Sequence, residues 1–128
     1  MDNFPTPFHD WLVEQRRWLH QHPELCYQEV KTAARIAEVA ESLGLAVETG
    51  VGRTGAIARL RAKRAGPTLA LRADMDALPL DEANAVPYKS RHPGVMHACG
   101  HDAHMTIALG VARWLVESRW PEEGRGEL

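Results

Sequence analysis

The chain has 128 residues, of which 45% are hydrophobic and 25% are charged, and its formal net charge is −2. This profile is typical of one ordinary soluble globular domain. The 15 Lys and Arg are outnumbered by 17 Asp and Glu, and their one short cluster at residues 59–64 is typical of a solvated strand end, so no nucleic acid partner is expected. Without a membrane-spanning apolar run or a secretion signal at residues 1–5, we expect a cytoplasmic protein with no membrane partner.

Three segments show apolar residues at helical spacing: residues 8–20, about 27–43, and 102 to about 118. The first pattern ends at His22, which precedes a proline and therefore avoids the α region. The second stops at Gly44, a residue that commonly follows the last helical turn. Asp102 stands where it could cap the first turn of the third helix.

Three short β-prone runs, residues 45–47, 55–60 and 67–71, are separated by breaks at 50–55 and 63–67. Residues 72–100 contain three prolines and few apolar repeats, which predicts a long ordered loop, and residues 120–128 look like a turn that leads into another strand. These elements predict an α/β fold in which three or four strands form a mixed sheet with helices on both faces.

Residues 97–104 hold an unusual density of side chains that can bind metal ions. Gly100 removes the side chain that would prevent the backbone from bending Cys99 and His101 toward one point. Two donors alone do not make a site, and the same pattern would fit a helix start at which Cys99 is a small buried residue. The candidates are His97, Cys99, His101, Asp102 and His104.

A second group of candidates follows the apolar run at 67–71. Asp74 and Asp76 have the period-two spacing of a strand and enter the long loop together. Ligands of α/β proteins gather at the carboxyl ends of strands, and two close carboxylates favour a nearby cation. A strand followed by an ordinary turn would look much the same.

The two cysteines, Cys26 and Cys99, are far apart in the sequence. An intracellular protein keeps its thiols reduced, so no disulfide is expected between them. Cys26 belongs to no motif, and we expect it to be a small buried side chain.

Four strings resemble the amidohydrolase branch of the M20 metallopeptidase family, which includes hippurate hydrolases, N-acyl-amino-acid amidohydrolases and auxin-conjugate hydrolases. They are HPEL at 22–25 with Glu29, RADMDALP at 72–79, PY at 87–88, and GVMHACGHDAH at 94–104. The resemblance extends in order from Trp11 to the end of the chain. It implies that residues 1–128 are the N-terminal part of a zinc-exopeptidase-like catalytic domain, without the lid or dimerisation domain and without the C-terminal catalytic half.

The resemblance also implies roles for individual residues. Cys99 and His101 would bind the metals, and Asp76 would orient a ligating imidazole. Asp74 stays ambiguous. Three further residues would support the site or face the substrate; they are His97, Asp102 and His104. The HPEL turn would be structural, with Glu29 in contact with a neighbouring loop.

The complete enzyme would hold two divalent ions, manganese or zinc, and cleave small N-acyl amino acids, such as hippurate-like substrates, to a carboxylic acid and an amino acid. It would be a homodimer or a larger homo-oligomer. The family's general-base glutamate, its neighbouring ligand and two later histidines have no counterpart in this sequence, so we expect the 128-residue chain alone to be inactive. The alternative is a non-catalytic metal-binding remnant or interaction domain.

Overall fold

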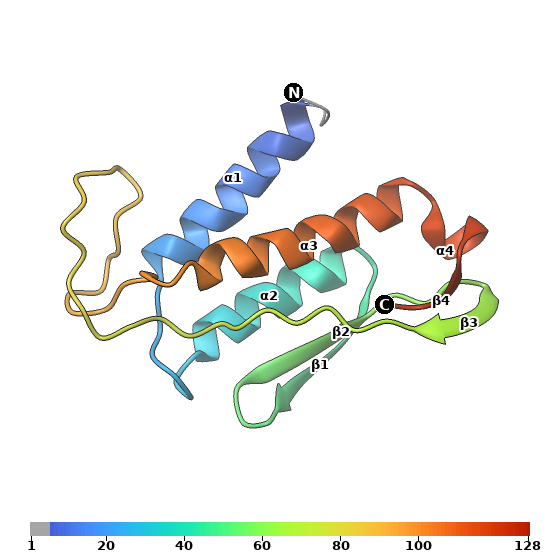
Figure 1. Cartoon of the computed structure of the whole chain (residues 1–128), viewed down its shortest axis with the longest axis horizontal. Helices are drawn as coiled ribbons and strands as arrows, with labels where there is room; N and C mark the ends of the chain where they lie inside the picture. Colours follow the sequence, from blue (N-terminus) through green and yellow to red (C-terminus); the bar gives the residue numbers. More distant parts are fainter. Residues whose placement is uncertain (1–5) are drawn as a thin grey trace.

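The computed structural model describes residues 6–128; residues 1–5, on which the expected lack of a secretion signal partly depended, lie outside this range. Within residues 6–128, four helices and four strands follow one another (Figure 1). No helix in residues 6–128 is long and apolar enough to cross a membrane. In order the elements are α1 (Thr6–Gln21), α2 (Val30–Ser42), β1 (Ala46–Val51), β2 (Gly55–Arg59), β3 (Arg64–Thr68), α3 (His101–Glu117), α4 (Trp120–Glu123) and β4 (Arg125–Glu127).

The three long helices confirm the apolar periodicity of the sequence, with one difference at the start of α2. This helix begins at Val30, not near residue 27, because Tyr27 has a φ of 61° and the Gln28 N–H bonds to the Leu25 carbonyl in a turn. The long helix α3 packs against both α1 and α2. A Cβ at Gly110 of α3 would lie 2.8 Å from the Leu12 side chain, so a glycine permits this close approach.

The strands differ from the predicted arrangement because they form two separate two-stranded ladders in the described chain. β1 and β2 form an antiparallel hairpin, whereas β3 and β4 pair in parallel. Residues 63–67, expected to be a turn, lie largely in β3. Residues 69–71, expected to be a strand, run on as extended chain outside either ladder, because a strand needs a partner along its length.

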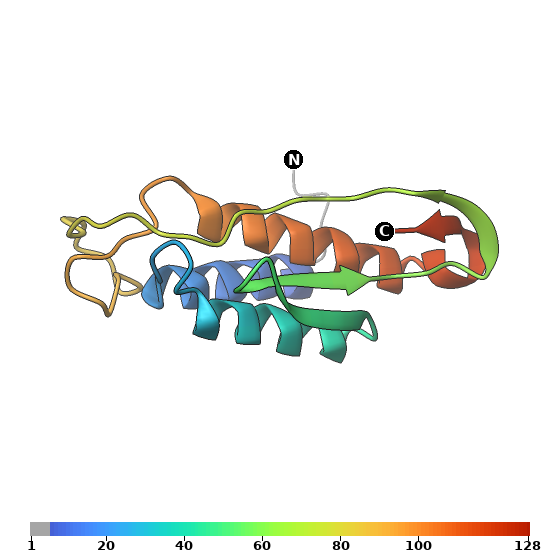
Figure 2. The ribbon, with the colours of Figure 1, turned by 90° about the horizontal axis from the view of Figure 1, so that it is seen from below.

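The helices α1, α2 and α3 all lie on one side of the β1–β2 hairpin (Figure 2). In residues 6–128 these helices cover one face of the hairpin, and no helix covers the other face. The main core lies between this layer and the hairpin, and Leu60 is only 5% exposed there. The buried residues of this core are Ala40, Leu45, Leu60 and Ala112.

The HPEL turn between α1 and α2 holds the loop that enters the candidate site. The Glu24 carbonyl accepts a 2.8 Å hydrogen bond from the Ala77 N–H, directly after Asp76. The Glu24 carboxylate accepts bonds from the Thr32 N–H at 2.7 Å and the Thr32 hydroxyl at 2.8 Å, at the start of α2. One residue therefore joins the helix start to the loop, which supports the structural interpretation of this turn.

Glu29 also makes a contact with a neighbouring loop, as the sequence predicted. Its carboxylate accepts a 2.6 Å hydrogen bond from the hydroxyl of Thr54, in the turn between β1 and β2. The contact ties the start of α2 to the hairpin and confirms the prediction of a contact with a neighbouring loop.

Replacing Glu24 with alanine should lower the free energy of unfolding by about 1 to 2 kcal/mol, because the Lys31 N–H and the two Thr32 donors at the start of α2 lose their acceptor. Urea denaturation followed by circular dichroism would measure the change. The matched control is Glu38→Ala on the exposed face of the same helix, where the side chain is 72% exposed and pairs only with Arg35. That change should stay within about 0.5 kcal/mol, and equal losses for both variants would contradict the role given to Glu24.

Candidate metal centre

Asp76, near the beginning of the long loop, contacts His101, the first residue of α3. The His101 Nδ1 atom lies 2.8 Å from the Asp76 carbonyl oxygen and 3.0 Å from the Asp76 Oδ1 atom. Both partners accept, so Nδ1 carries a proton, and in the neutral ring Nε2 keeps its lone pair. A histidine held in this tautomer by a carboxylate is the arrangement found around metal-ligating imidazoles.

Cys99 precedes His101 by two residues and is exposed with a free thiol. This exposure excludes the alternative in which Cys99 is a small buried residue. Gly100 between them adopts a φ of 85°, a left-handed conformation that costs other residues free energy. The glycine is therefore needed to turn the chain from the loop into α3.

Cys26 is exposed as well, so the prediction that it is buried was wrong. Cys26 lies directly after the HPEL turn, in the irregular segment between α1 and α2. Both thiols are free.

The two flanking histidines have opposite surroundings. His97 is only 4% exposed, and neither ring nitrogen has a hydrogen-bond partner in the described chain. Burial lowers the pKa of His97, and the nearby Asp102 carboxylate only partly opposes that shift. His104 is exposed, with its ring centre 5.7 Å from that of His101.

The two remaining carboxylates lie apart from the His101 ring nitrogens. Asp74 pairs with Arg72 at 2.7 Å and is about half exposed. Asp102 is completely buried in the first turn of α3 and contacts His20 Nδ1 at 2.6 Å and Arg16 Nε at 3.0 Å. Its Oδ1 atom accepts a 2.9 Å hydrogen bond from the Ala103 N–H, so Asp102 binds a donor of the first turn as expected, although the N-cap residue itself is Gly100.

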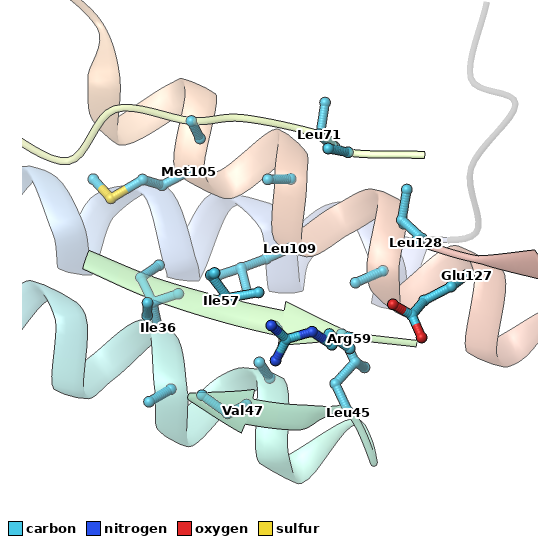
Figure 3. A pocket seen from close by; sticks show the side chains of 18 of the residues that line it. Ile36, Leu45, Val47, Ile57, Arg59, Leu71, Met105, Leu109, Glu127 and Leu128 are labelled. Atoms are coloured by element: carbon cyan, nitrogen blue, oxygen red, sulfur yellow. The ribbon is translucent and has the colours of Figure 1, made fainter. Parts of the chain in front are cut away.

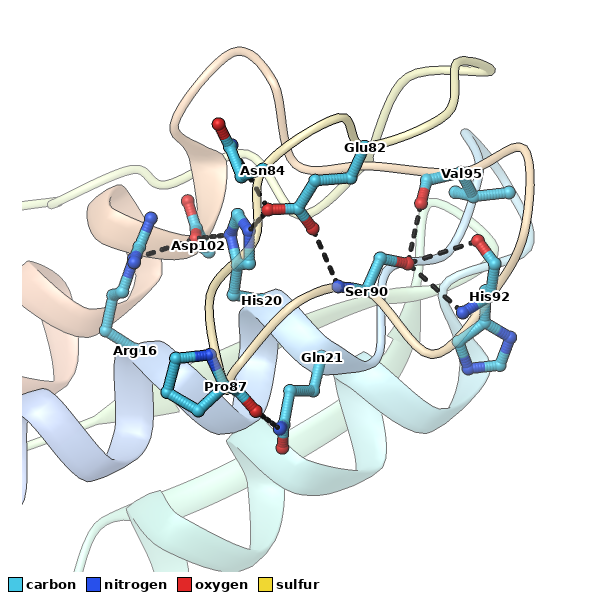
Figure 4. Close-up of polar contacts among 10 residues, drawn as sticks. All are labelled: Arg16, His20, Gln21, Glu82, Asn84, Pro87, Ser90, His92, Val95 and Asp102. Atoms are coloured by element: carbon cyan, nitrogen blue, oxygen red, sulfur yellow. Dashed lines mark hydrogen bonds and ion pairs between the residues drawn. The ribbon is translucent and has the colours of Figure 1, made fainter.

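Arg16, His20, Glu82 and Asp102 form a charged cluster, in which all members but the partly exposed Arg16 are buried (Figure 4). The two nitrogens of His20 contact two carboxylates, Asp102 at 2.6 Å and Glu82 at 3.1 Å. When both carboxylates are ionised, each His20 nitrogen donates a proton to one of them, and the ring then carries a positive charge. The cluster joins α1, α3 and the long loop.

Glu82 is the residue through which the long loop contacts this cluster. Burial by itself would raise the pKa of the Glu82 carboxyl, but the Ser90 N–H at 2.7 Å, the bonds from His20 and Asn84, and the charge of His20 hold that pKa below its usual value. The loop is thus fixed at its middle by a carboxylate that favours its ionised form.

Sequence reasoning missed this cluster. His20 and Glu82 are separated by 62 positions and belong to no string that suggests a pair. The available signal was a histidine next to Leu19 on the apolar face of α1, which by itself is equally consistent with an isolated core histidine.

The donors at the centre have the chemistry of a divalent metal site: a thiol, an imidazole with a free Nε2 atom and an orphaned buried imidazole at His97. In residues 6–128 no group of three or more His, Cys, Asp or Glu side chains is arranged to hold an ion.

Comparisons with known proteins now identify the family. Residues 70–125 match the peptidase family M20/M25/M40. The fold superposes with a TM-score of 0.85 on the crystal structure of Bacillus subtilis YXEP, described as a dinuclear metal binding peptidase from the M20 family, at 40% identity over 91% of this chain and 33% of that one. This chain belongs to the M20 family.

Two M20 relatives carry different names. The M20 chain is 44% identical over 117 residues to the N-acyl-L-amino acid amidohydrolase of Geobacillus stearothermophilus, covering 91% of this chain and 31% of that protein. It is 48% identical over 111 residues to thermostable carboxypeptidase 2 of Saccharolobus solfataricus, covering 86% and 28%. The M20 chain thus spans about a third or less of the length of these relatives.

Replacing Gly100 with alanine should destabilise the M20 chain by about 1 kcal/mol, because alanine resists a positive φ although nothing lies within 4 Å of the added Cβ. The matched control is Gly94→Ala, with a φ of 77° and the same open space. Both variants should lose similar stability in thermal unfolding, but only Gly100→Ala should weaken binding of Zn²⁺ in calorimetry. Equal metal affinities for the two variants would contradict a site at the Cys99–His101 turn.

Replacing Glu82 with glutamine should lower the free energy of unfolding by about 3 kcal/mol at neutral pH, because the buried His20 cation loses one of its two carboxylates. The folded-state pKa of Glu82 is lowered, so its contribution is complete above the usual value of 4.5 and disappears as pH falls through the folded value. Urea titrations at several pH values should show the difference from wild type shrinking below that value. A constant difference would contradict the ionised anchor, and Glu123→Gln, 70% exposed, serves as control.

Proposed function

We propose that this chain forms part of the metal-dependent active site of an M20 amidohydrolase. The observation that carries the proposal is the contact of the His101 Nδ1 atom with Asp76, which leaves Nε2 free beside an exposed cysteine. The supporting relative from Geobacillus stearothermophilus is named an N-acyl-L-amino acid amidohydrolase.

Two divalent ions, manganese or zinc, would occupy the centre in the complete enzyme, in line with the dinuclear YXEP structure. Cys99 and His101 would hold them, with the thiol deprotonated. Asp76 would keep the proton on His101 Nδ1 and fix the ring orientation, which raises the basicity of Nε2. When bound, the ions would polarise the acyl carbonyl and lower the pKa of a bound water.

The surrounding side chains would take different parts. His104 is exposed beside the His101 ring and would face the substrate. His97, buried with both nitrogens unpaired, would line the inner wall of the centre as a neutral imidazole, since burial lowers its pKa. Asp102 would support the site from behind by holding α3 to α1 through His20 and Arg16.

The substrates would be small N-acyl amino acids, cleaved to a carboxylic acid and an amino acid. Relatives named N-acyl-L-amino acid amidohydrolase, N-acetyl-L-cysteine deacetylase and IAA-amino acid hydrolase ILR1-like 5 support an amide bond to an amino acid as the point of cleavage. The complete enzyme would be a homo-oligomer. We expect no cleavage of hippurate or N-acetyl amino acids by the 128-residue chain alone, because only two of the proposed ligands are on it.

Metal binding tests the proposal directly. Cobalt(II) added to the reduced chain should give a thiolate-to-metal charge-transfer band in the near ultraviolet, and Zn²⁺ should abolish it by competition. Cys99→Ser should remove the band and His101→Ala should weaken binding at least tenfold. Asp76→Asn should weaken binding by about 10-fold or more without removing the band, because the thiolate remains.

The matched control is Cys26→Ser, since Cys26 is also an exposed free thiol. It should leave the cobalt spectrum unchanged. A band that survives Cys99→Ser but is lost in Cys26→Ser would overturn the assignment. If the pure chain bound metal and also hydrolysed hippurate, the proposed metal site would stand, but the expected inactivity of the chain would be refuted.

A further inference from the structure

A groove of about 540 Å³, called here the α1 groove, lies between α1 and residues 87–88 of the long loop. It differs from the groove between β2 and residues 69–75, whose walls are mainly apolar (Figure 3). The α1 groove carries charges of both signs and two aromatic rings, and its volume lies in the range of small-molecule sites, about 300 to 1,000 Å³. Four of its polar side chains recur every three or four residues along one face of α1: Asp10, Glu14, Arg17 and Gln21.

Two contacts hold the loop wall of the α1 groove in place. The Gln21 side-chain amide donates a 3.3 Å hydrogen bond to the Pro87 carbonyl (Figure 4). The guanidinium carbon of Arg17 lies 4.8 Å from the centre of the Tyr88 ring, within the range of a cation–π contact. The protein's own contacts therefore form this wall, which keeps the ordering cost of ligand binding small.

Glu14 and Arg17 lie one helical turn apart on α1, yet they do not pair with each other. Elsewhere in the described chain, neighbours at the same spacing do pair, as Arg35 and Glu38 do at 3.1 Å. Because the Arg17 guanidinium contacts Tyr88 instead, the exposed Glu14 carboxylate makes no ion pair or hydrogen bond within residues 6–128. Arg17 has no carboxylate partner in the same range. The groove thus keeps one anion and one cation available for a ligand.

Trp18 and Val13 supply the apolar part of the α1 groove. The Trp18 ring is held by stacking on the His22 ring, with the two ring centres 4.3 Å apart. Both Trp18 and Val13 are only partly buried, so apolar surface remains accessible. A fixed apolar wall therefore stands beside the two available charges.

We propose that the α1 groove binds a free amino acid with an apolar side chain. The ammonium group of the ligand pairs with Glu14 and its carboxylate with Arg17. The apolar side chain of the ligand lies against Trp18 and Val13. A free amino acid carries its two charges on one carbon, which matches two opposite charges one helical turn apart. A neutral apolar ligand would use neither charge, and a simple cation or anion would use only one.

A titration of the metal-free 128-residue chain with L-phenylalanine, followed by NMR, tests this site. The residues that line the groove include none of the proposed metal ligands, so a chelator in the buffer should not prevent binding. The indole signal of Trp18 and the backbone amide signals of Val13 and Arg17 should move and saturate together at millimolar ligand concentrations. The indole signal of Trp114, which is 54% exposed on α3, should stay in place.

Two ligands that each lack one charge separate the two ionic contacts. Phenethylamine has no carboxylate and 3-phenylpropanoate has no ammonium group, so each should bind about fivefold more weakly than phenylalanine. Glu14→Gln should weaken binding of phenylalanine and phenethylamine by about fivefold and leave that of 3-phenylpropanoate unchanged. Arg17→Gln should weaken binding of phenylalanine and 3-phenylpropanoate and leave that of phenethylamine unchanged.

The matched control is Glu41→Gln, which removes an exposed carboxylate of α2 outside the groove and should change none of the three affinities. Equal binding of phenethylamine and phenylalanine would overturn the amino-acid site and indicate a site for cations. If the Trp18 and Val13 signals do not respond to phenylalanine, the groove binds no such ligand. Equal losses for all three ligands in Arg17→Gln would indicate that the variant displaces Tyr88, and the pairing of Arg17 with the carboxylate would be wrong.

Discussion

The imidazole ring of His20 lies between the carboxylates of Asp102 and Glu82, and this buried contact connects α1 to α3 and to the long loop. A cation in a medium of low polarity needs compensating charge close by, and the two carboxylates come from α3 and from the long loop. The helix that begins with His101 and the loop that follows Asp76 are therefore held to the same residue of α1. The loop is long, yet it has a definite position.

The second fixed point of that loop lies directly next to the candidate centre. Glu24 binds the N–H of Ala77 and the start of α2, so Asp76 is placed by a short turn with two anchors. His101 in turn is oriented by Asp76. Precise ligand orientation then depends on the packing of helices and turns, and little of it depends on the exposed loop surface.

The same fold leaves a gap where a sheet would be continuous. The β1–β2 hairpin and the β3–β4 ladder are connected only through Leu60 to Ala62 and Gly126 to Leu128, and the extended residues 69–75 run beside an open groove. Exposed strand edges with apolar walls favour association with another strand.

The sequence by itself determined the α/β class, the three long helices, the long loop and the cluster of donors at residues 97–104. These features depend on local patterns: apolar spacing, prolines, and the turn that Gly100 permits. Asp76 was found because its spacing from the apolar run, together with the resemblance to M20 enzymes, indicated a ligand-orienting role. That role remains a prediction, although the structure brings Asp76 and His101 together.

Only the tertiary structure decided the charged cluster, the exposure of Cys26 and the pairing of the strands. His20 and Glu82 have no local signal, because their partners lie 62 and 82 positions away. Residues 69–71 have strand-like composition, but a ladder needs hydrogen-bonding partners on a neighbouring segment, and composition does not specify them. Local periodicity thus fixes which segments are helical or extended, whereas contacts between distant residues determine which charges meet and which strands pair.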